Sequence, residues 1–273
     1  SENRYEWAVV DLAIQMIGGI NVSLYTTLPA SQCEYILQDS ETRMFFVSTG
    51  IQLKKAVEVY ENCEQLIEII AFDNPKNKTH ASKDFVHLFE DVLNEGAKQT
   101  EKYNSEIKKR VNAVSVEDIS TLIYTSGTTG RPKGAMLTHQ NIVSNVKAAT
   151  KHIYWDDKDR LLSFLPLCHS FERTAGYYAI ISCGAEIYYA ESVDTVSKNM
   201  PEVKPTVMIS VPRLFEKIYN LIVKSVEEGS DTKKKVFNWA VETGRKYASG
   251  KRGLVSVQKK IADKLVFNKL KER

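Results

Sequence analysis

Short apolar runs alternate with segments of helical spacing through the first two-thirds of the chain. Apolar residues that recur every three or four positions predict helices, and continuous runs rich in β-branched residues predict buried strands. The predicted strands are Ile20–Leu24, Met44–Ser48, Leu66–Phe72, Ile119–Thr125, Gly134–Leu137, Leu161–Leu165, Glu186–Ala190 and Lys204–Pro212. The predicted helices between them are Tyr5–Ile17, Ser31–Asp39, Gln52–Glu61, Phe85–Val111 and Thr174–Ser182, with one more capped by Thr138. Strands separated by helices of this size indicate parallel β-α-β units, and therefore an α/β fold.

From Arg213 onward the pattern is helical only. It predicts helices at Arg213–Glu228, Thr232–Ala248 and Val255–Lys271, and Pro212 is well placed to start the first of them. The lysine runs in this stretch are typical of solvated helix faces. We therefore divide the chain into a first β-α-β subregion (1–112), a subregion that carries the candidate chemistry (113–212) and a helical segment (213–273).

The composition is that of an ordinary globular protein of 273 residues, 43% of them hydrophobic and 26% charged. A formal charge of +3 is too small to indicate a nucleic-acid partner. The four cysteines have no C-x-x-C spacing, which favours buried thiols in a reducing compartment over a disulfide framework or a zinc site. No apolar run reaches the roughly 18 residues that span a bilayer.

One loop concentrates hydroxyl groups and glycines. It follows a predicted strand directly and reads Thr125-Ser126-Gly127-Thr128-Thr129-Gly130-Arg131-Pro132-Lys133-Gly134. Its glycines allow backbone conformations that point consecutive N–H groups at an anion, and its hydroxyls add neutral donors and oxygen ligands for Mg²⁺. Pro132 fixes the backbone before Lys133, whose ammonium can meet a phosphate. These residue types together predict a triphosphate-binding loop.

The loop fits neither of two common phosphate-binding patterns. Counted from Gly127, G-x-x-x-x-G-K-[ST] fails because position 132 is proline, and G-x-G-x-x-G fails because Thr129 stands in place of the second glycine. A phosphotransferase or NTPase with a Walker loop is therefore disfavoured. A solvent-exposed turn would need only one or two of these residues, so we set that alternative aside.

The residues YTSGTTGRPKG closely resemble the phosphate-binding signature of the adenylate-forming acyl-CoA synthetases and ligases, a highly specific motif. Two further segments, SFLPLCHSFERTAGYY (163–178) and KPTVMISVPRLFEKIY (204–219), are similar to the long-chain fatty acid branch. The resemblance covers essentially the whole chain. It implies an α/β fold with parallel-rich β-sheets flanked by helices, here as an internal segment of the large N-terminal domain that binds ATP and the acyl group.

The resemblance implies a two-step reaction that uses ATP, Mg²⁺ and coenzyme A. A carboxylate attacks the α-phosphate of ATP to give acyl-AMP and pyrophosphate, and the thiol of coenzyme A then displaces AMP. By motif match, Thr125 contacts Mg²⁺ and phosphate, and Lys133 is a catalytic residue that also holds phosphate. The remaining implied nucleotide contacts are Ser126, Gly127, Thr128, Thr129, Gly130 and Gly134.

His169 follows the end of a predicted strand, where open α/β sheets place ligands. From its residue type alone, a packed or surface histidine is the better interpretation. The resemblance instead places it beside the acyl carboxylate and the α-phosphate, as a catalytic residue that orients substrate. Glu172 is the second implied substrate residue, and a simple ion pair with Arg173 that positions the loop is an equal alternative. We expect Cys168 in the core.

Several motifs of this family are not in the sequence. They are Tyr-Gly-x-Thr-Glu, whose glutamate contacts Mg²⁺, Thr-Gly-Asp for the ribose hydroxyls, and the C-terminal lid domain with its catalytic lysine. We therefore expect the parent protein to be a long-chain fatty acid–CoA ligase, and this chain alone to be inactive. The open alternatives are a ligase for a short-chain, aromatic or amino acid, and a non-catalytic nucleotide-binding module.

The expected partners of the parent protein are a fatty acid, ATP and coenzyme A, without nucleic acid. We expect a cytoplasmic location. Because a long-chain substrate partitions into membranes, peripheral membrane contact stays open, and so does a homodimer. No segment is basic and amphipathic clearly enough to predict a helix that lies on a membrane surface.

Overall fold

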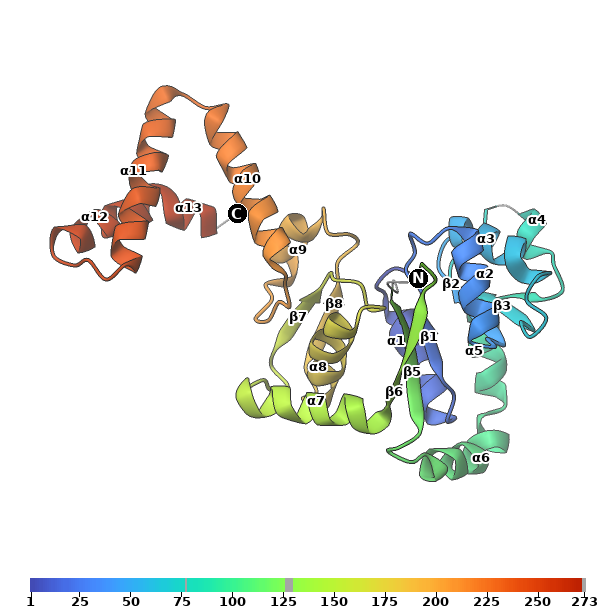
Figure 1. Ribbon diagram of the computed structural model, residues 1–273. Helices are drawn as coiled ribbons and strands as arrows, with labels where there is room; N and C mark the ends of the chain where they lie inside the picture. Colours follow the sequence, from blue (N-terminus) through green and yellow to red (C-terminus); the bar gives the residue numbers. More distant parts are fainter. Residues whose placement is uncertain (77, 126–129, 272–273) are drawn as a thin grey trace. The chain divides into compact units, whose positions relative to one another are not determined.

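The computed structural model describes residues 1–76, 78–125 and 130–271 (Figure 1). The chain divides into two compact units. Unit 1 comprises Ser1–Val196 and Val203–Ile209, and it contains all strands of the described residues. Unit 2 comprises Ser197–Glu202 and Ser210–Arg273, and its described part is helical.

A parallel sheet in unit 1 carries much of the apolar core. Its strands are β2 (Met44–Val47), β3 (Glu68–Ala71) and β4 (Val86–Leu88), and helices α2 (Ala30–Asp39) and α3 (Gly50–Tyr60) belong to the same core. Helical spacing brings three residues of α3 onto one buried face, as the sequence predicts. The buried core residues are Leu37, Val47, Leu53, Ala56, Val59, Cys63, Leu66, Ile69, Ala71 and Val86.

A second sheet holds the candidate loop. Strand β5 (Ile119–Thr125) pairs in parallel with β1 (Asn21–Ser23) and antiparallel with β6 (Lys133–Thr138). The antiparallel pair follows from the short connection, since a parallel pair needs a crossover of a dozen or more residues. Helix α1 (Tyr5–Met16) precedes β1, while α4 (Lys78–Ala81), α5 (Phe89–Lys98) and α6 (Thr100–Ala113) lie between β3 and β5 in the chain.

The predicted helix cap at Thr138 is confirmed. Helix α7 (His139–His152) begins with a reciprocal pair of bonds, in which Thr138 Oγ1 accepts from the Asn141 N–H and Asn141 Oδ1 accepts from the Thr138 N–H. Each bond satisfies a donor that the first helical turn would otherwise leave without a partner. The cap therefore fixes where β6 ends.

A third sheet carries the second candidate segment. Strands β7 (Arg160–Ser163) and β8 (Glu186–Tyr189) are parallel, and the chain between them forms a π-helical segment, η1 (Glu172–Tyr178), that continues into α8 (Ala179–Ser182). Such π-helical turns are rare and are frequent at functional sites. The carboxyl ends of β5 and β7 lie on the same side of unit 1 (Figure 1).

Unit 2 is helical in its described part, and short turns join the helices from α10 onward. Pro212 starts the first long one, as predicted, and Ser230 caps the next by accepting from the Lys233 N–H. None of the helices in the described part of the chain is long and apolar enough to cross a membrane. The elements are α9 (Val196–Val203), α10 (Pro212–Glu227), α11 (Asp231–Ala248), α12 (Leu254–Ala262), η2 (Asp263–Phe267) and α13 (Asn268–Lys271).

Two segments differ from the predictions. The expected strand Lys204–Pro212 is wrong, because this segment forms only an isolated bridge between Leu161 and Val207. Lys204 has a φ of +49° and Pro205 has no N–H to donate, so the pairing with β7 does not extend toward the start of the segment, and Pro212 at its end begins α10. Conversely, β4 replaces the start of a predicted helix. Three residues are too few to show strand alternation in the sequence. Strand β4 forms because it pairs in parallel with β3.

Candidate functional site

Thr125 and Lys133 are paired residues at the loop end of the β5–β6 hairpin. Both side chains are exposed. Residues paired directly across two strands direct their side chains to the same face of the sheet. The hairpin therefore presents a hydroxyl and an ammonium together, and both are carried by regular strands.

The next pair in the hairpin explains one of the glycines. Gly134 is paired with Tyr124, and a Cβ at position 134 would come within 3.0 Å of the Tyr124 ring. The hydroxyl of Tyr124 donates to Asp39 Oδ2 over 2.6 Å. Burial, and then the hydrogen bond to Asp39, raise the pKa of Tyr124. The other described glycine of the loop, Gly130, has a φ of +92°, which residues with a side chain rarely adopt.

Helix α2 supports both sides of the loop. In addition to Asp39, which holds Tyr124 at the end of β5, Tyr35 donates its hydroxyl to the carbonyl of Pro132 over 3.2 Å. The two α2 residues are four positions apart and therefore lie on the same face of the helix. The guanidinium of Arg131 lies 5.7 Å from the centre of the Tyr35 ring. Sequence reasoning missed this support, because no motif marks Tyr35 or Asp39.

The described part of the loop includes four of the predicted nucleotide contacts: Thr125, Gly130, Lys133 and Gly134. The other four predicted contacts, Ser126, Gly127, Thr128 and Thr129, lie outside the described residues. Their roles therefore stay predictions.

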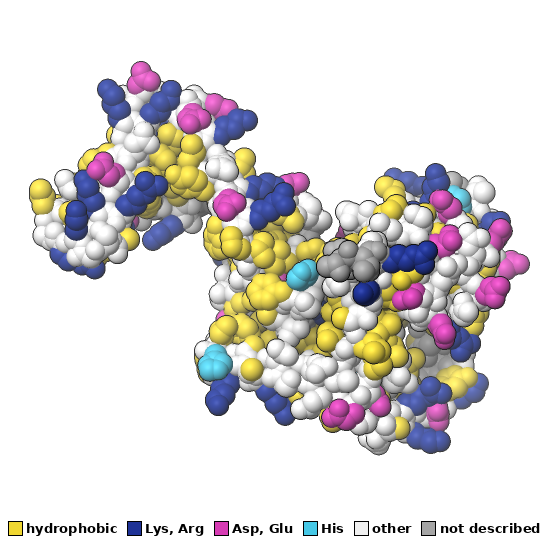
Figure 2. All heavy atoms as spheres, viewed as in Figure 1, with side chains coloured by type: hydrophobic (Ala, Val, Ile, Leu, Met, Phe, Trp, Pro, Cys, Tyr) yellow, Lys and Arg dark blue, Asp and Glu magenta, His cyan; other side chains and the backbone are white. Residues whose placement is uncertain are grey.

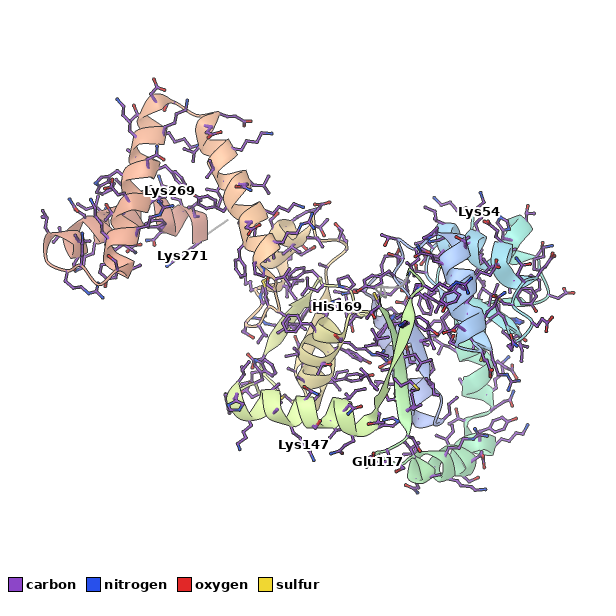
Figure 3. All side chains as sticks on the ribbon, in the orientation of Figure 1. Lys54, Glu117, Lys147, His169, Lys269 and Lys271 are labelled. Carbon is purple, nitrogen blue, oxygen red and sulfur yellow. The ribbon has the colours of Figure 1, made fainter. Side chains whose placement is uncertain are left out.

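His169 begins the turn that leads into η1. Its backbone N–H donates to the Pro166 carbonyl over 2.9 Å, and its carbonyl accepts from the Arg173 N–H over 3.0 Å. Its Nδ1 accepts from the Phe171 N–H over 3.3 Å, so the neutral ring carries its proton on Nε2. The side chain is exposed, and Figure 3 shows it near the carboxyl end of β7. The Nε2–H is thus a donor that can meet an anion.

Glu172, in contrast, is buried and only 1% exposed. Its Oε1 accepts from Ser163 Oγ over 2.6 Å, while Oε2 has no hydrogen-bond partner among the described residues. Burial, opposed in part by the bond from Ser163, raises the pKa of Glu172 to about 7. A Cβ at Gly176 would lie 2.7 Å from the carboxyl carbon, so the glycine leaves room for this carboxyl group.

The ion pair between Glu172 and Arg173, which the sequence left open, does not form. Arg173 pairs instead with Asp11 of α1, and it donates to Ser23 Oγ over 3.1 Å and to Thr121 Oγ1 over 2.6 Å. Burial alone would lower the pKa of Arg173, but its carboxylate and hydroxyl partners outweigh burial, and the pKa is raised. This buried network joins η1 to α1, β1 and β5.

Asn3 fixes the segment between β7 and His169. Its Nδ2 donates to Ser163 Oγ over 3.1 Å and to the Leu165 carbonyl over 2.7 Å, and its Oδ1 accepts from the Leu167 N–H over 3.1 Å. Sequence reasoning missed Asn3, which no motif marks. It also missed Asp11, although a charged residue within the apolar pattern of a helix was a usable signal.

Three of the predicted site residues that the structure describes carry exposed side-chain donors for an anion: the Thr125 hydroxyl, the Lys133 ammonium and the His169 Nε2–H. No group of three or more His, Cys, Asp or Glu in the described ranges could hold a metal ion. The Thr125 oxygen suits Mg²⁺ as a single ligand. A Mg²⁺ ion at this site would therefore depend on further oxygens, such as those of a phosphate substrate.

An α/β fold with these exposed donors fits a protein that binds an anionic ligand. The family of AMP-binding enzymes matches residues 1–267, and the chain belongs to this family. The family and the α/β class expected from the sequence are thereby confirmed.

Two similar curated proteins are long-chain-fatty-acid–CoA ligases. The chain is 31% identical to the long-chain-fatty-acid–CoA ligase ACSBG2 of Homo sapiens, over 98% of this chain and 40% of that protein. It is 32% identical to the long-chain-fatty-acid–CoA ligase FadD15 of Mycobacterium bovis, over 99% of this chain and 44% of that protein. The chain thus spans about two-fifths of the length of these curated relatives.

A solved structure has the same fold. It is the anthranilate CoA ligase AuaEII in complex with anthranoyl-AMP, with a TM-score of 0.63 and 20% identity, over 80% of this chain and 40% of that one.

Proposed function

We propose that the parent protein, the full-length gene product, activates a long-chain fatty acid to acyl-CoA through an acyl adenylate. The observation that carries the proposal is the Thr125–Lys133 pair at the hairpin end, in a chain that aligns over 98–99% of its length with two long-chain-fatty-acid–CoA ligases. Membership of the AMP-binding enzyme family supports ATP as the second substrate.

The first step brings two anions together. A carboxylate oxygen of the fatty acid attacks the α-phosphorus of ATP, the bond to the bridging oxygen breaks, and pyrophosphate leaves with the electron pair. In this proposal Lys133 offsets the charge of the β- and γ-phosphates, and Thr125 contacts the Mg²⁺ that arrives with ATP. Ser126, Gly127, Thr128, Thr129, Gly130 and Gly134 complete the phosphate contacts. Donors held in place before the reaction need no reorganisation as charge develops.

His169 orients the reacting groups in this proposal. Its Nε2–H, fixed by the Phe171 bond to Nδ1, donates to the acyl carboxylate or to the α-phosphate. Glu172 is buried, so we propose that it does not contact the substrate itself. It supports the substrate site through its hydrogen bond with Ser163. In the second step the sulfur of coenzyme A attacks the acyl carbon, and AMP leaves.

Location and assembly of the parent protein are part of the same proposal. We place it in the cytoplasm because its cysteines at positions 33, 63, 168 and 183 are free thiols. Peripheral contact with a membrane is expected from a substrate that partitions into bilayers. We also propose a homodimer, which sedimentation of the full-length protein tests.

The test is carboxylate-dependent exchange of pyrophosphate into ATP by the full-length protein, with acetate, octanoate, palmitate and benzoate. We expect the fastest exchange with palmitate. Lys133→Ala should slow the exchange about a hundredfold or more. Lys147→Ala, which changes an exposed lysine of α7 labelled in Figure 3, should leave the rate unchanged. Fastest exchange with another acid would keep adenylation and change the substrate. No exchange with any acid, in folded protein, would refute the proposal.

A further inference from the structure

The positive charge of the chain is concentrated near residue 260. Residues 251–271 contain seven Lys and Arg and one Asp, whereas the rest of the chain contains 30 Lys and Arg and 33 Asp and Glu. The net charge of +3 is thus the sum of +6 in this short stretch and −3 everywhere else. The basic stretch forms α12, η2 and α13 of unit 2.

The same helices carry a row of exposed apolar side chains, which we call the α12 stripe. Its first three members follow one another in α12 at intervals of three and four residues, so they lie along one face of that helix, and the fourth follows four residues later in η2. Side chains this large and apolar normally avoid water when they lie in a continuous row. The stripe consists of Leu254, Val257, Ile261 and Leu265, which are 74%, 56%, 48% and 46% exposed.

A different face of these helices packs within unit 2. Ala262 is fully buried, and Phe267 lies so close to Gly244 of α11 that a Cβ there would come within 3.3 Å of its ring. Lys259 Nζ pairs with Asp263 Oδ1 at 2.5 Å and lies 5.1 Å from the centre of the Phe267 ring. The single acidic residue of this stretch is therefore already paired with a lysine.

Lysines border the stripe. Lys260 and Lys264 are exposed, and both lie one residue before a member of the stripe. Lys251 and Lys269 are exposed beyond its two ends. Figure 2 shows Lys and Arg side chains spread over α11 and α12 of unit 2, and Figure 3 shows the position of Lys269.

We propose that the α12 stripe, with Lys260 and Lys264 at its border, is a docking surface for an anionic phospholipid bilayer. The apolar side chains enter the boundary between head groups and acyl chains, and the lysine ammonium groups meet lipid phosphates and carboxylates. Charge complementarity selects an anionic bilayer. A nucleic acid suits this face less well, because its central row offers no partner for phosphate. The inference rests on the membrane contact proposed above but not on the proposed catalysis, since docking needs neither ATP nor a carboxylate.

The test is flotation of the 273-residue chain with vesicles of phosphatidylcholine, with and without phosphatidylserine. We expect binding only where phosphatidylserine is present. Lys260→Gln with Lys264→Gln should weaken this binding roughly twentyfold. Leu254→Ser with Val257→Ser, at the two most exposed positions of the stripe, should weaken it roughly tenfold.

Two matched controls separate this face from general surface effects. Lys108→Gln with Lys109→Gln removes the same charge from the exposed face of α6, and Ile51→Ser with Val116→Ser removes exposed apolar side chains of unit 1. Both control variants should bind like the wild type. Circular dichroism confirms that each variant is folded.

Four outcomes would overturn the proposal. They are no binding to anionic vesicles, equal binding by all variants, loss of binding in the lysine variant alone, and tighter binding to DNA than to vesicles. A dimer that dissociates in the Leu254→Ser, Val257→Ser variant, without vesicle binding, would make the stripe a contact between two copies of the chain. Failure of the exchange assay would leave this result unaffected.

Discussion

Glu172→Gln replaces a buried carboxyl group with an uncharged amide of the same shape. Burial raises the pKa of Glu172 from 4.5 to about 7, so the folded state binds this proton more tightly than the unfolded state does. The stabilisation from the proton is complete below about pH 4.5 and is lost as the pH rises through 7. The glutamine keeps the bond from Ser163, because its amide oxygen can still accept it.

The size of the effect follows from the two pKa values. The full difference between 4.5 and 7 corresponds to about 3 kcal/mol in the free energy of unfolding. By linkage, the wild-type protein loses about 2.5 kcal/mol of this free energy of unfolding as the pH rises from about 5 to about 8. Relative to wild type, the Glu172→Gln protein should therefore become more stable by about 2.5 kcal/mol over this pH range.

Urea unfolding from about pH 5 to pH 8 measures this difference. Trp7 is a local reporter, since its ring centre lies 5.5 Å from that of Tyr177 in η1. Replacing Trp155 and Trp239 by Phe in all proteins leaves Trp7 as the only tryptophan. Glu117→Gln, at an exposed position labelled in Figure 3, is the control and should parallel the wild type. A Glu172→Gln profile that also parallels the wild type would refute the reasoning from burial.

Two further substitutions test the supports of the site. Asp11→Asn leaves the guanidinium of Arg173 buried without its carboxylate, and it should lower the free energy of unfolding by about 3–5 kcal/mol, measured with urea. Gly176→Ala should lower the thermal midpoint, at a cost of about 1–3 kcal/mol, because its Cβ would lie 2.7 Å from the Glu172 carboxyl group. Gly96→Ala in α5, where a Cβ meets nothing within 4 Å, should instead stabilise by up to about 1 kcal/mol. A rise in midpoint for both glycine variants would contradict the crowding at η1.

Local signals were enough for much of the fold. Strand β5 was predicted to the residue, because a β-branched run ends at a glycine-rich loop, and the cap at Thr138 was predicted from its hydroxyl. Pairing between distant segments was not available from the sequence. The segment Lys204–Pro212 reads as a buried strand, yet its place beside β7 allows one bridge only. The strand β4 depends in the same way on the edge of β3.

In the candidate site, too, local residue chemistry was predictable from the sequence, whereas contacts between distant residues were not. Hydroxyls, glycines and a lysine in one loop predict anion binding from residue chemistry, whereas the pairing of Thr125 with Lys133 appears only in the hairpin. A Glu beside an Arg reads as an ion pair, and only the folded chain gives Glu172 and Arg173 separate partners. The α12 stripe has the spacing of an ordinary buried helix face. The sequence alone does not show that this face is exposed. The structure shows it, because the helices pack within unit 2 through a different face.

The central claim is that the loop end of the β5–β6 hairpin binds the phosphates of ATP. Calorimetric titration of the 273-residue chain with Mg·ATP tests it most directly, with wild type, Lys133→Ala and the surface control Lys147→Ala. We expect wild type and Lys147→Ala to bind with equal affinity and Lys133→Ala to bind roughly tenfold or more weakly. Equal heats for all three proteins, or none from folded wild type, would contradict the claim.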